Sequence, residues 1–389
     1  MKLRSRPEDF IVEEVSRLAP GGRGAREGPY GLYRLRKRSI TTPEAVRRVA
    51  RAGRIDPGRI RYSGLKDRHA ITVQFVTIFG KPVRALEGPG FRLAPVGRSP
   101  KAAGPGEIER NSFRLTLRDL ARDEAERAAG RAEAYARSGI PNYFDEQRFG
   151  SARTTGVFPG ELAARGDWEG ALRLVIATSS REDSKDVKRR RRMVDEGWGD
   201  WPAVKAKLDR SSERSIVTYL GDHPTDFVGA FDRLRESLRT IVLSAFQSLV
   251  WNEVLSGVVR ARCGEAWTHK GRYDEIAFFA PGNASAGALR GVTIAFPHRA
   301  TKMRDADAAE AFSRALSRRG LTLDSFRLRG LKKGHFWRGE RAALANVTGF
   351  SARPPFPDEM NAGRFALELR FSLPPGAYAT MFVKAATGG

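Results

Sequence analysis

The sequence contains little cysteine and little histidine. Cys263 is the single cysteine among 389 residues, and only five histidines occur. One cysteine excludes an intramolecular disulfide, a Cys-rich zinc site and an iron–sulfur cluster held by cysteines. The histidines also lack the spacing of the common zinc-binding motifs. We therefore expect no metal site in this chain.

Long apolar runs are scarce as well. We find no stretch that approaches the roughly 18–20 apolar residues of a membrane span. The N-terminal segment from Met1 to Phe10 is charged and lacks the apolar part of a secretory signal. We expect a soluble cytoplasmic protein that has no membrane partner.

Acidic residues are in the minority. Asp and Glu number 45 against 69 Lys and Arg, which gives a formal charge of +24 and a pI of about 10.8. This excess indicates a polyanionic partner or an acidic membrane surface, and it argues against an enzyme for small neutral metabolites. Hydrophobic residues make up 41% of the chain, which excludes a disordered tail. The length suggests two or three domains.

One glycine-rich segment, residues 20–31, stands out. It lacks the Gly-Lys-Ser/Thr ending of a phosphate-binding loop, and it shows no cofactor-binding glycine pattern after a strand. We interpret it as a flexible loop that faces RNA. The missing pattern argues against one rival function, an RNA methyltransferase.

Period-2 apolar patterns lie near both ends of the chain and predict strands. They occur in residues 70–79, in Phe113 to Leu117, and in Phe365 to Phe371. A sheet assembled from both ends implies that the middle of the chain is an insertion. Helices are predicted from Thr42 as N-cap, over 120–139, as a pair in 225–262 broken near Arg239, and over 306–319.

Two basic stretches have open interpretations. Residues 188–192 form a charge run that is either a solvated helix or loop face, or a phosphate-contacting segment. Residues 328–341 interleave Phe336 and Trp337 with Lys and Arg. These two aromatic residues either anchor the core or stack on bases.

The densest cluster of ionisable residues runs from Lys66 to His69, directly before the apolar strand at 70–79. Cations on both sides of Asp67 favour its ionised form, which suits a nucleophile or an electrostatic stabiliser. Taken alone, this segment is more typical of a surface turn with alternating charges. Five other segments accompany it: Arg6–Glu14, Arg110–Phe113, Pro141–Gly150, Ala245–Asn252 and Leu373–Thr380.

In sequence and in order, the six segments resemble the motifs of the TruD family of tRNA pseudouridine synthases. The resemblance implies an α+β fold, in which a catalytic domain with a mixed, largely antiparallel sheet is interrupted by an inserted α/β domain. We expect the catalytic domain to comprise residues 1–153 plus 341–389, and the insertion to comprise 154–340.

The resemblance also assigns residues to a site. Asp67 matches the catalytic aspartate, and Arg4 matches a basic residue that pairs with it. The substrate-binding positions are Arg4, Phe10, Asn111, Phe113, Arg148, Phe149 and Phe371. Purely structural interpretations stay open for several of them, because Phe10, Phe113 and Phe371 fit core aromatics, Asn111 fits a turn and Arg4 fits a surface charge.

The implied activity is isomerisation of a tRNA uridine, most simply uridine 13, to pseudouridine, with no cofactor and no metal. Asp67 would either attack C1′ of the ribose or abstract a proton from C2′. The expected partner is tRNA, and the expected protein is a monomer without an obligate protein partner. The alternatives are another tRNA position, another RNA, or an inactive RNA-binding homologue. Asp145 and Glu146 depart from the family motif, in which the first of these positions is glycine.

Overall fold

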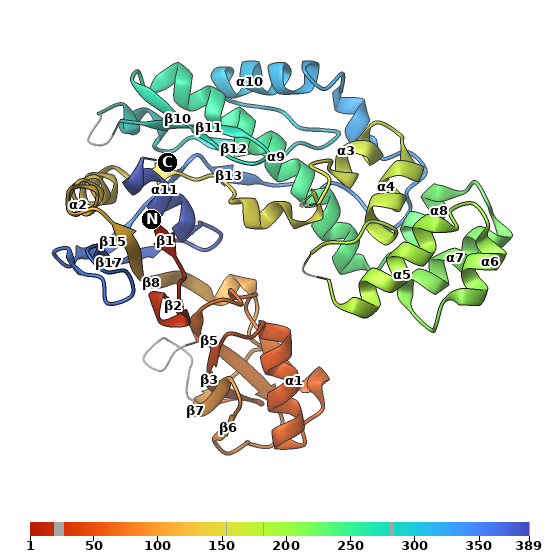
Figure 1. Cartoon of the computed structure of the whole chain (residues 1–389), viewed down its shortest axis with the longest axis horizontal. Helices are drawn as coiled ribbons and strands as arrows, with labels where there is room; N and C mark the ends of the chain where they lie inside the picture. Colours follow the sequence, from red (N-terminus) through yellow and green to blue (C-terminus); the bar gives the residue numbers. More distant parts are fainter. Residues whose placement is uncertain (19–26, 153, 182, 281–283, 389) are drawn as a thin grey trace. The chain divides into compact units, whose positions relative to one another are not determined.

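The computed structural model describes residues 1–18, 27–152, 154–181, 183–280 and 284–388. Most of the glycine-rich segment 20–31 therefore lies outside the described residues. The chain divides into two compact units (Figure 1). The first unit comprises Met1–Ile140 and Ala345–Gly388, and the second comprises Pro141–Leu344.

The first unit is built on one sheet whose strands follow the order β15-β17-β8-β2-β5-β3-β7-β6. The pairing of β2 with β5 is parallel, and the other pairings described within this sheet are antiparallel. The predicted mixed, largely antiparallel sheet is thus confirmed. The strands are β1 (Lys2–Leu3), β2 (Phe10–Ser16), β3 (Tyr30–Arg38), β4 (Ile60–Tyr62), β5 (Ile71–Phe79), β6 (Leu86–Gly88), β7 (Phe91–Ser99), β8 (Ile108–Leu120), β15 (Thr348–Ala352), β16 (Phe356–Pro357) and β17 (Phe365–Leu373).

The predicted strands from the two ends of the chain lie next to each other. Phe371 of β17 is opposite Phe113 of β8, and Phe113 is opposite Val12 of β2. Because residues directly opposite one another point to the same face, the apolar residues of these three strands form one continuous surface. β5 departs from simple alternation, because its residues are buried on both faces of the sheet and only Phe79, at the end of the strand, is exposed.

Helices α1 (Thr42–Gly53), α2 (Arg122–Ser138) and α11 (Ala379–Thr387) cover the sheet in the described part of the first unit. α2 ends as predicted, at Gly139 with a φ of +84°. The predicted N-cap of α1 is wrong by one residue, because the side chain of Thr41 accepts from Glu44 N. Thr42 is fully buried in the first turn of α1, where its hydroxyl forms a hydrogen bond with Gln74. Short 3-10 helices are η1 (Pro7–Asp9), η2 (Pro57–Arg59) and η3 (Pro105–Glu107).

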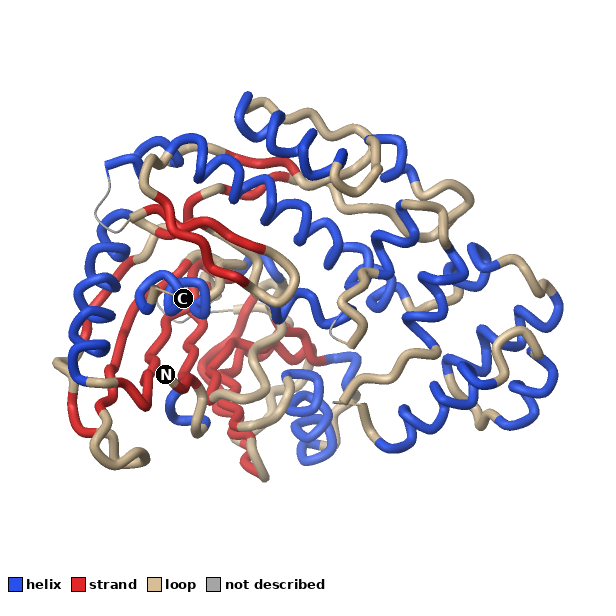
Figure 2. The backbone as a smooth tube through the Cα atoms, turned by 45° about the horizontal axis from the view of Figure 1, so that its top comes forward, coloured by secondary structure: helices blue, strands red, loops and turns tan. Residues whose placement is uncertain are grey.

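The second unit is mainly helical (Figure 2). Its helices are α3 (Pro159–Ala164), α4 (Trp168–Ile176), α5 (Lys185–Glu196), α6 (Trp201–Lys207), α7 (Ser212–Asp222), α8 (Phe227–Asp232), α9 (Glu236–Arg262) and α10 (Ala306–Ser317). Two antiparallel ladders pair β10 (Ala266–Lys270) with β11 (Glu275–Phe279) and β12 (Thr293–Ala295) with β13 (Glu340–Ala342). The remaining short elements are β9 (Ile140–Pro141), β14 (Leu344–Ala345), η4 (Glu146–Ala152), η5 (Ala284–Leu289) and η6 (Leu323–Arg327).

The long helix α9 corrects two predictions. The break between the helices of 225–262 lies at residues 233–235, and Arg239 is inside α9, where its guanidinium donates to the carbonyls of Asp232 and Leu234. Contrary to our expectation, α9 is also long and apolar enough to span a membrane by length and composition, with a window hydropathy of 1.3. However, 83% of that window is buried in the protein, as in the core helix of a globular unit.

Candidate active site

Asp67 lies on the loop between β4 and β5, and buried side chains hold the backbone of this loop. Lys66 N donates to Thr42 Oγ1 at 3.0 Å, and the Thr42 hydroxyl donates to Gln74 Oε1 at 3.0 Å. The amide nitrogen of Gln74 in turn donates to Gly64 O at 3.2 Å. Thr42 and Gln74 are fully buried. Since their polar atoms have partners in the loop, packing of the core fixes the position of the loop.

Lys37 of β3 holds the Asp67 backbone itself. Its ammonium donates to Asp67 O at 2.5 Å, and the residue is completely buried. Burial lowers the pKa of Lys37 from its ordinary 10.5 to about 8; the Asp67 charge opposes this change and the Lys66 charge adds to it. Lys37 is therefore a positive group that reaches the Asp67 loop through a carbonyl rather than through the carboxylate.

The Asp67 carboxylate forms an ion pair with Arg4, as the resemblance implied. Arg4 Nη2 donates to Asp67 Oδ2 at 3.2 Å, with the two side chains 26% and 20% exposed. The Arg4 guanidinium also lies 4.1 Å from the centre of the Phe10 ring. Arg4 has a φ of +68°, in the left-handed region that costs a non-glycine residue about 1–3 kcal/mol. This strained residue thus connects the carboxylate to the aromatic residues.

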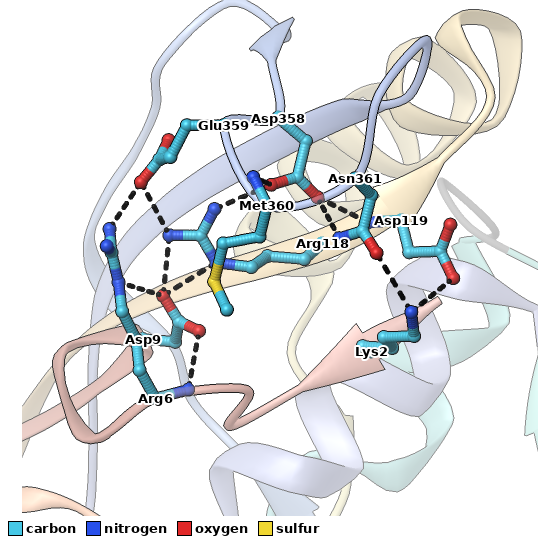
Figure 3. A network of polar contacts seen from close by, with 9 residues as sticks. All are labelled: Lys2, Arg6, Asp9, Arg118, Asp119, Asp358, Glu359, Met360 and Asn361. Atoms are coloured by element: carbon cyan, nitrogen blue, oxygen red, sulfur yellow. Dashed lines mark hydrogen bonds and ion pairs between the residues drawn. The ribbon is translucent and has the colours of Figure 1, made fainter.

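A polar network with members on both sides of Arg4 ties the N-terminal segment to the sheet (Figure 3). Arg118 of β8 is 1% exposed, and it donates to Asp9 Oδ1 at 2.9 Å and to Asp358 Oδ1 at 2.7 Å. Hydrogen bonds to Asp9 are the main cause that raises the pKa of Arg118, and Asp358 adds to this. Nearby, Lys2 pairs with Asp119 at 3.3 Å. The network fixes the segment on both sides of Arg4.

Three predicted aromatic residues form one cluster. The rings of Phe113 and Phe371 stack at 5.4 Å with 24° between their planes, and Phe10 meets Phe113 edge-on at 6.4 Å. Phe10 and Phe371 are almost fully buried, whereas Phe113 is 9% exposed. The cluster supports the position of Phe113 from both sides. Its role in stacking on a base stays a prediction.

A buried charge pair lies beside Asp67. Lys66 Nζ is 2.9 Å from Glu14 Oε2 and donates to Asn111 Oδ1 at 2.7 Å. Glu14 and Asn111 are opposite each other on β2 and β8. Glu14, Lys37, Lys66 and Gln74 were not predicted as site residues from the sequence. A signal was present for Glu14, because it continues the buried alternation of Phe10 and Val12 and thus places a carboxylate at a core position.

The structure brings Arg4, Phe10, Asp67, Asn111, Phe113 and Phe371 together in the first unit. Arg148 and Phe149 belong to η4 of the second unit. Phe149 is buried against Phe158 and Tyr273, with ring centres 5.6 and 5.7 Å away, and Arg148 donates to Ser248 Oγ at 3.4 Å.

The two acidic residues that depart from the motif lie at the start of η4, with Asp145 directly before this helix and Glu146 as its first residue. Asp145 O accepts from Arg148 N, and Glu146 Oε1 accepts from Arg272 N at 3.1 Å. Asp145 is buried. Across the described residues, no group of three or more His, Cys, Asp or Glu side chains is arranged to hold a metal ion.

Comparison with known proteins gives a consistent result. The family model described as tRNA pseudouridine synthase D (TruD) matches residues 1–385. The chain is 30% identical to "Probable tRNA pseudouridine synthase D 2" of Methanocaldococcus jannaschii, over 99% of this chain and 91% of that protein. It is 32% identical to "tRNA pseudouridine synthase D" of Geobacter sulfurreducens, over 97% and 91%.

A solved structure is similar over the whole length. It is the crystal structure of the putative tRNA pseudouridine synthase D (TruD) of Methanosarcina mazei, with a TM-score of 0.72 and 25% sequence identity. The similarity covers 100% of this chain and 93% of that one.

Proposed function

Because this chain belongs to the TruD family of tRNA pseudouridine synthases, we propose that it isomerises uridine 13 of tRNA to pseudouridine with Asp67 as the catalytic residue. The observation that carries this proposal is the Asp67 carboxylate, which a buried polar framework holds through its backbone and which Arg4 pairs at 3.2 Å. A carboxylate fixed in this way is pre-organised to act at one carbon of the ribose.

The reaction breaks the bond between N1 of uracil and C1′, turns the base, and forms a bond from C5 to C1′. Asp67 either attacks C1′ to form an ester that the returning base displaces, or removes a C2′ proton and later returns it. In both routes Arg4 orients the carboxylate. A group other than residue 113 must remove the proton from C5, because Phe113 lacks the hydroxyl with which a tyrosine at this position could accept it.

The base must leave the RNA stack to reach Asp67, which is a general requirement for chemistry on a base in a folded nucleic acid. We propose that Phe113, supported by Phe10 and Phe371, packs against the extruded uracil. Arg148 and Phe149 are proposed to contact the tRNA. The first unit would be the catalytic domain and the second the insertion that selects the tRNA. The sequence-based domain boundaries lie at 153/154 and 340/341, whereas the two compact units divide at 140/141 and 344/345.

The binding surface is proposed to include the basic stretch 328–341. Its two aromatic residues differ, since Phe336 is 3% exposed and belongs to the core, whereas Trp337 is 53% exposed. The charge run 188–192 lies on α5, where Arg190 and Arg191 pair with Glu213 and Asp183. We propose that the enzyme works in the cytoplasm as a monomer and needs no cofactor.

The test is release of tritium from tRNA that carries [5-³H]uridine, followed by mapping of the modified position. We expect Asp67→Asn to lower release by at least about 10³-fold, because the reacting group is lost, while tRNA binding persists. Asp123→Asn is the matched control, since Asp123 is an exposed helical aspartate that also pairs with an arginine, Arg127. Release by Asp67→Asn at the wild-type rate would refute the assignment.

A second comparison separates the alternatives. A transcript in which uridine 13 is replaced by cytidine should release nothing from that position. Release that continues, and maps elsewhere, would favour another target position. Absence of release from every RNA pool, with tRNA binding retained, would favour the inactive RNA-binding homologue.

A further inference from the structure

Lys66 occupies an unusual position for a cation beside a catalytic carboxylate. Its side chain is only 7% exposed and that of Glu14 is completely buried. A buried pair of this kind is costly to form unless its geometry is good and its other hydrogen-bonding capacity is used. Lys66 uses part of that capacity on Asn111 Oδ1, at 2.7 Å.

This contact determines which way round the Asn111 amide lies. An ammonium group donates three hydrogen bonds and accepts none. The Asn111 atom next to Lys66 must therefore be the oxygen, whichever way an isolated asparagine amide might be assigned. Glu14 holds the ammonium from the neighbouring strand, opposite Asn111.

The other end of the amide is left for a ligand. Asn111 is partly exposed, and its amide nitrogen has no hydrogen-bond partner within the described parts of the chain. Asn111 also lies two residues before Phe113 on the same face of β8. The Asn111 side chain thus turns its oxygen to Lys66 and leaves its two N–H donors for a ligand, next to the ring that is proposed to support the base.

We propose that Lys66, held by Glu14, is a positioning residue that fixes the Asn111 amide as a hydrogen-bond donor, and that this donor makes the site accept uracil and reject cytosine. This inference rests on the proposed function. Uracil carries a carbonyl oxygen at C4, which accepts from the Asn111 amide. Cytosine carries an amino group there, and two donors facing each other leave both without a partner.

The test measures binding, so that it does not depend on turnover. Two tRNA transcripts are prepared that differ only in uridine or cytidine at the target position. Their Kd values are compared in the Asp67→Asn background, which leaves the base unchanged. We expect a preference for uridine of about 10–100-fold, as for one well-matched base contact.

Asn111→Asp is the decisive variant. Lys66 would still hold one carboxylate oxygen, and the other would face the base as an acceptor, which suits the cytosine amino group. We expect the uridine-to-cytidine ratio of Kd values to shift toward cytidine by about 10-fold or more. Asn346→Asp, an exposed position in the same unit, adds the same charge and should leave the ratio unchanged.

The role of Lys66 is tested with its partner removed as well. The double variant Glu14→Gln with Lys66→Met leaves no unpaired buried charge, and its Asn111 amide is free to turn. We expect the base preference to fall toward 1, whereas Lys66→Arg, which also only donates, should retain it. The proposal is wrong if Asn111→Asp and the double variant both keep the wild-type ratio of Kd values. It is also wrong if Asn111→Asp weakens the binding of both RNAs equally.

The two hypotheses fail in different ways. If Asp67 is not the catalytic residue, tritium release survives in Asp67→Asn but the base preference still responds to Asn111. If the inference fails, Asp67→Asn is inactive but the base preference is unaffected by Asn111 and Lys66.

Discussion

Replacing Arg118 by methionine should strongly destabilise the first unit. The guanidinium is surrounded by carboxylates from two distant parts of the chain, namely Asp9, Asp358 and Glu359 (Figure 3). Methionine fills a similar volume but leaves Asp358, which is 5% exposed, without its cation. Asp9, which is 1% exposed, keeps only the longer ion pair with Arg6, at 3.4 Å. Removing one partner of a buried pair costs about 3–5 kcal/mol.

The pH dependence of this loss can be derived from Asp358. Its burial would raise its pKa, but hydrogen bonds from Met360 N, Asn361, Asp119 N and Arg118 outweigh burial and lower it below its usual 3.8. A lowered carboxyl pKa contributes stability above the unfolded value and loses it as the pH falls below that value. The difference between wild type and Arg118→Met should therefore be largest near pH 7 and shrink below about pH 4.

The assay must report on the first unit alone. All six tryptophans of the chain, at positions 168, 198, 201, 251, 267 and 337, belong to the second unit, so tryptophan fluorescence follows only that unit. Hydrogen exchange of peptides from β8 and β17 follows the first. A loss of 3 kcal/mol or more accelerates their slowest amides by at least about 10²-fold, while the fluorescence transition should move little.

Two outcomes would contradict this reasoning. Acceleration by less than about 5-fold, which corresponds to about 1 kcal/mol, would mean that the network contributes little. An equal effect in Arg127→Met would mean that any arginine loss acts in this way. Arg127 is an exposed residue of α2 in a surface ion pair, which is worth about 0–1 kcal/mol.

Three further predictions concern Lys37 and the basic stretch 328–341, which is proposed to bind tRNA. Between about pH 8 and 10.5 Lys37 binds more protons in the unfolded chain than in the folded one, so it should raise the free energy of unfolding by up to about 3 kcal/mol over this range. Lys37→Met should lack this rise when unfolding by urea is followed by circular dichroism. A parallel rise in both proteins would contradict the prediction. Trp337→Ala should weaken tRNA binding about 5–100-fold with an unchanged salt slope, because stacking carries no charge. Lys332→Gln with Lys333→Gln should reduce that slope in anisotropy titrations, and no response to either change would exclude this stretch from the interface.

Sequence patterns predicted the elements whose signals are local. The alternation in Phe113 to Leu117 and in Phe365 to Phe371 gave two strands that the structure contains. Gly139 marked the end of α2 because its φ of +84° favours glycine. In each case neighbouring residues contain the whole signal.

The errors have non-local causes. The break between the helices of 225–262 was expected near Arg239, yet Arg239 lies inside α9 with its guanidinium on the carbonyls of Asp232 and Leu234. Thr42 was expected to cap α1, but its hydroxyl is hydrogen-bonded to Gln74 and to the Lys66 backbone in the Asp67 loop. Both side chains satisfy partners that local sequence does not reveal.

In the candidate site, too, the local sequence gives one part of the signal and distant residues give the rest. The segment Lys66 to His69, taken alone, was more typical of a charged surface turn. What makes it a site is beneath it, where Glu14, Gln74 and Lys37 reach the loop from three neighbouring strands. Each is polar but stands where the strand pattern requires an apolar residue, and each is buried. Burying them costs free energy that apolar residues would not cost, so their presence at core positions of adjacent strands is itself a signal for a pre-organised site.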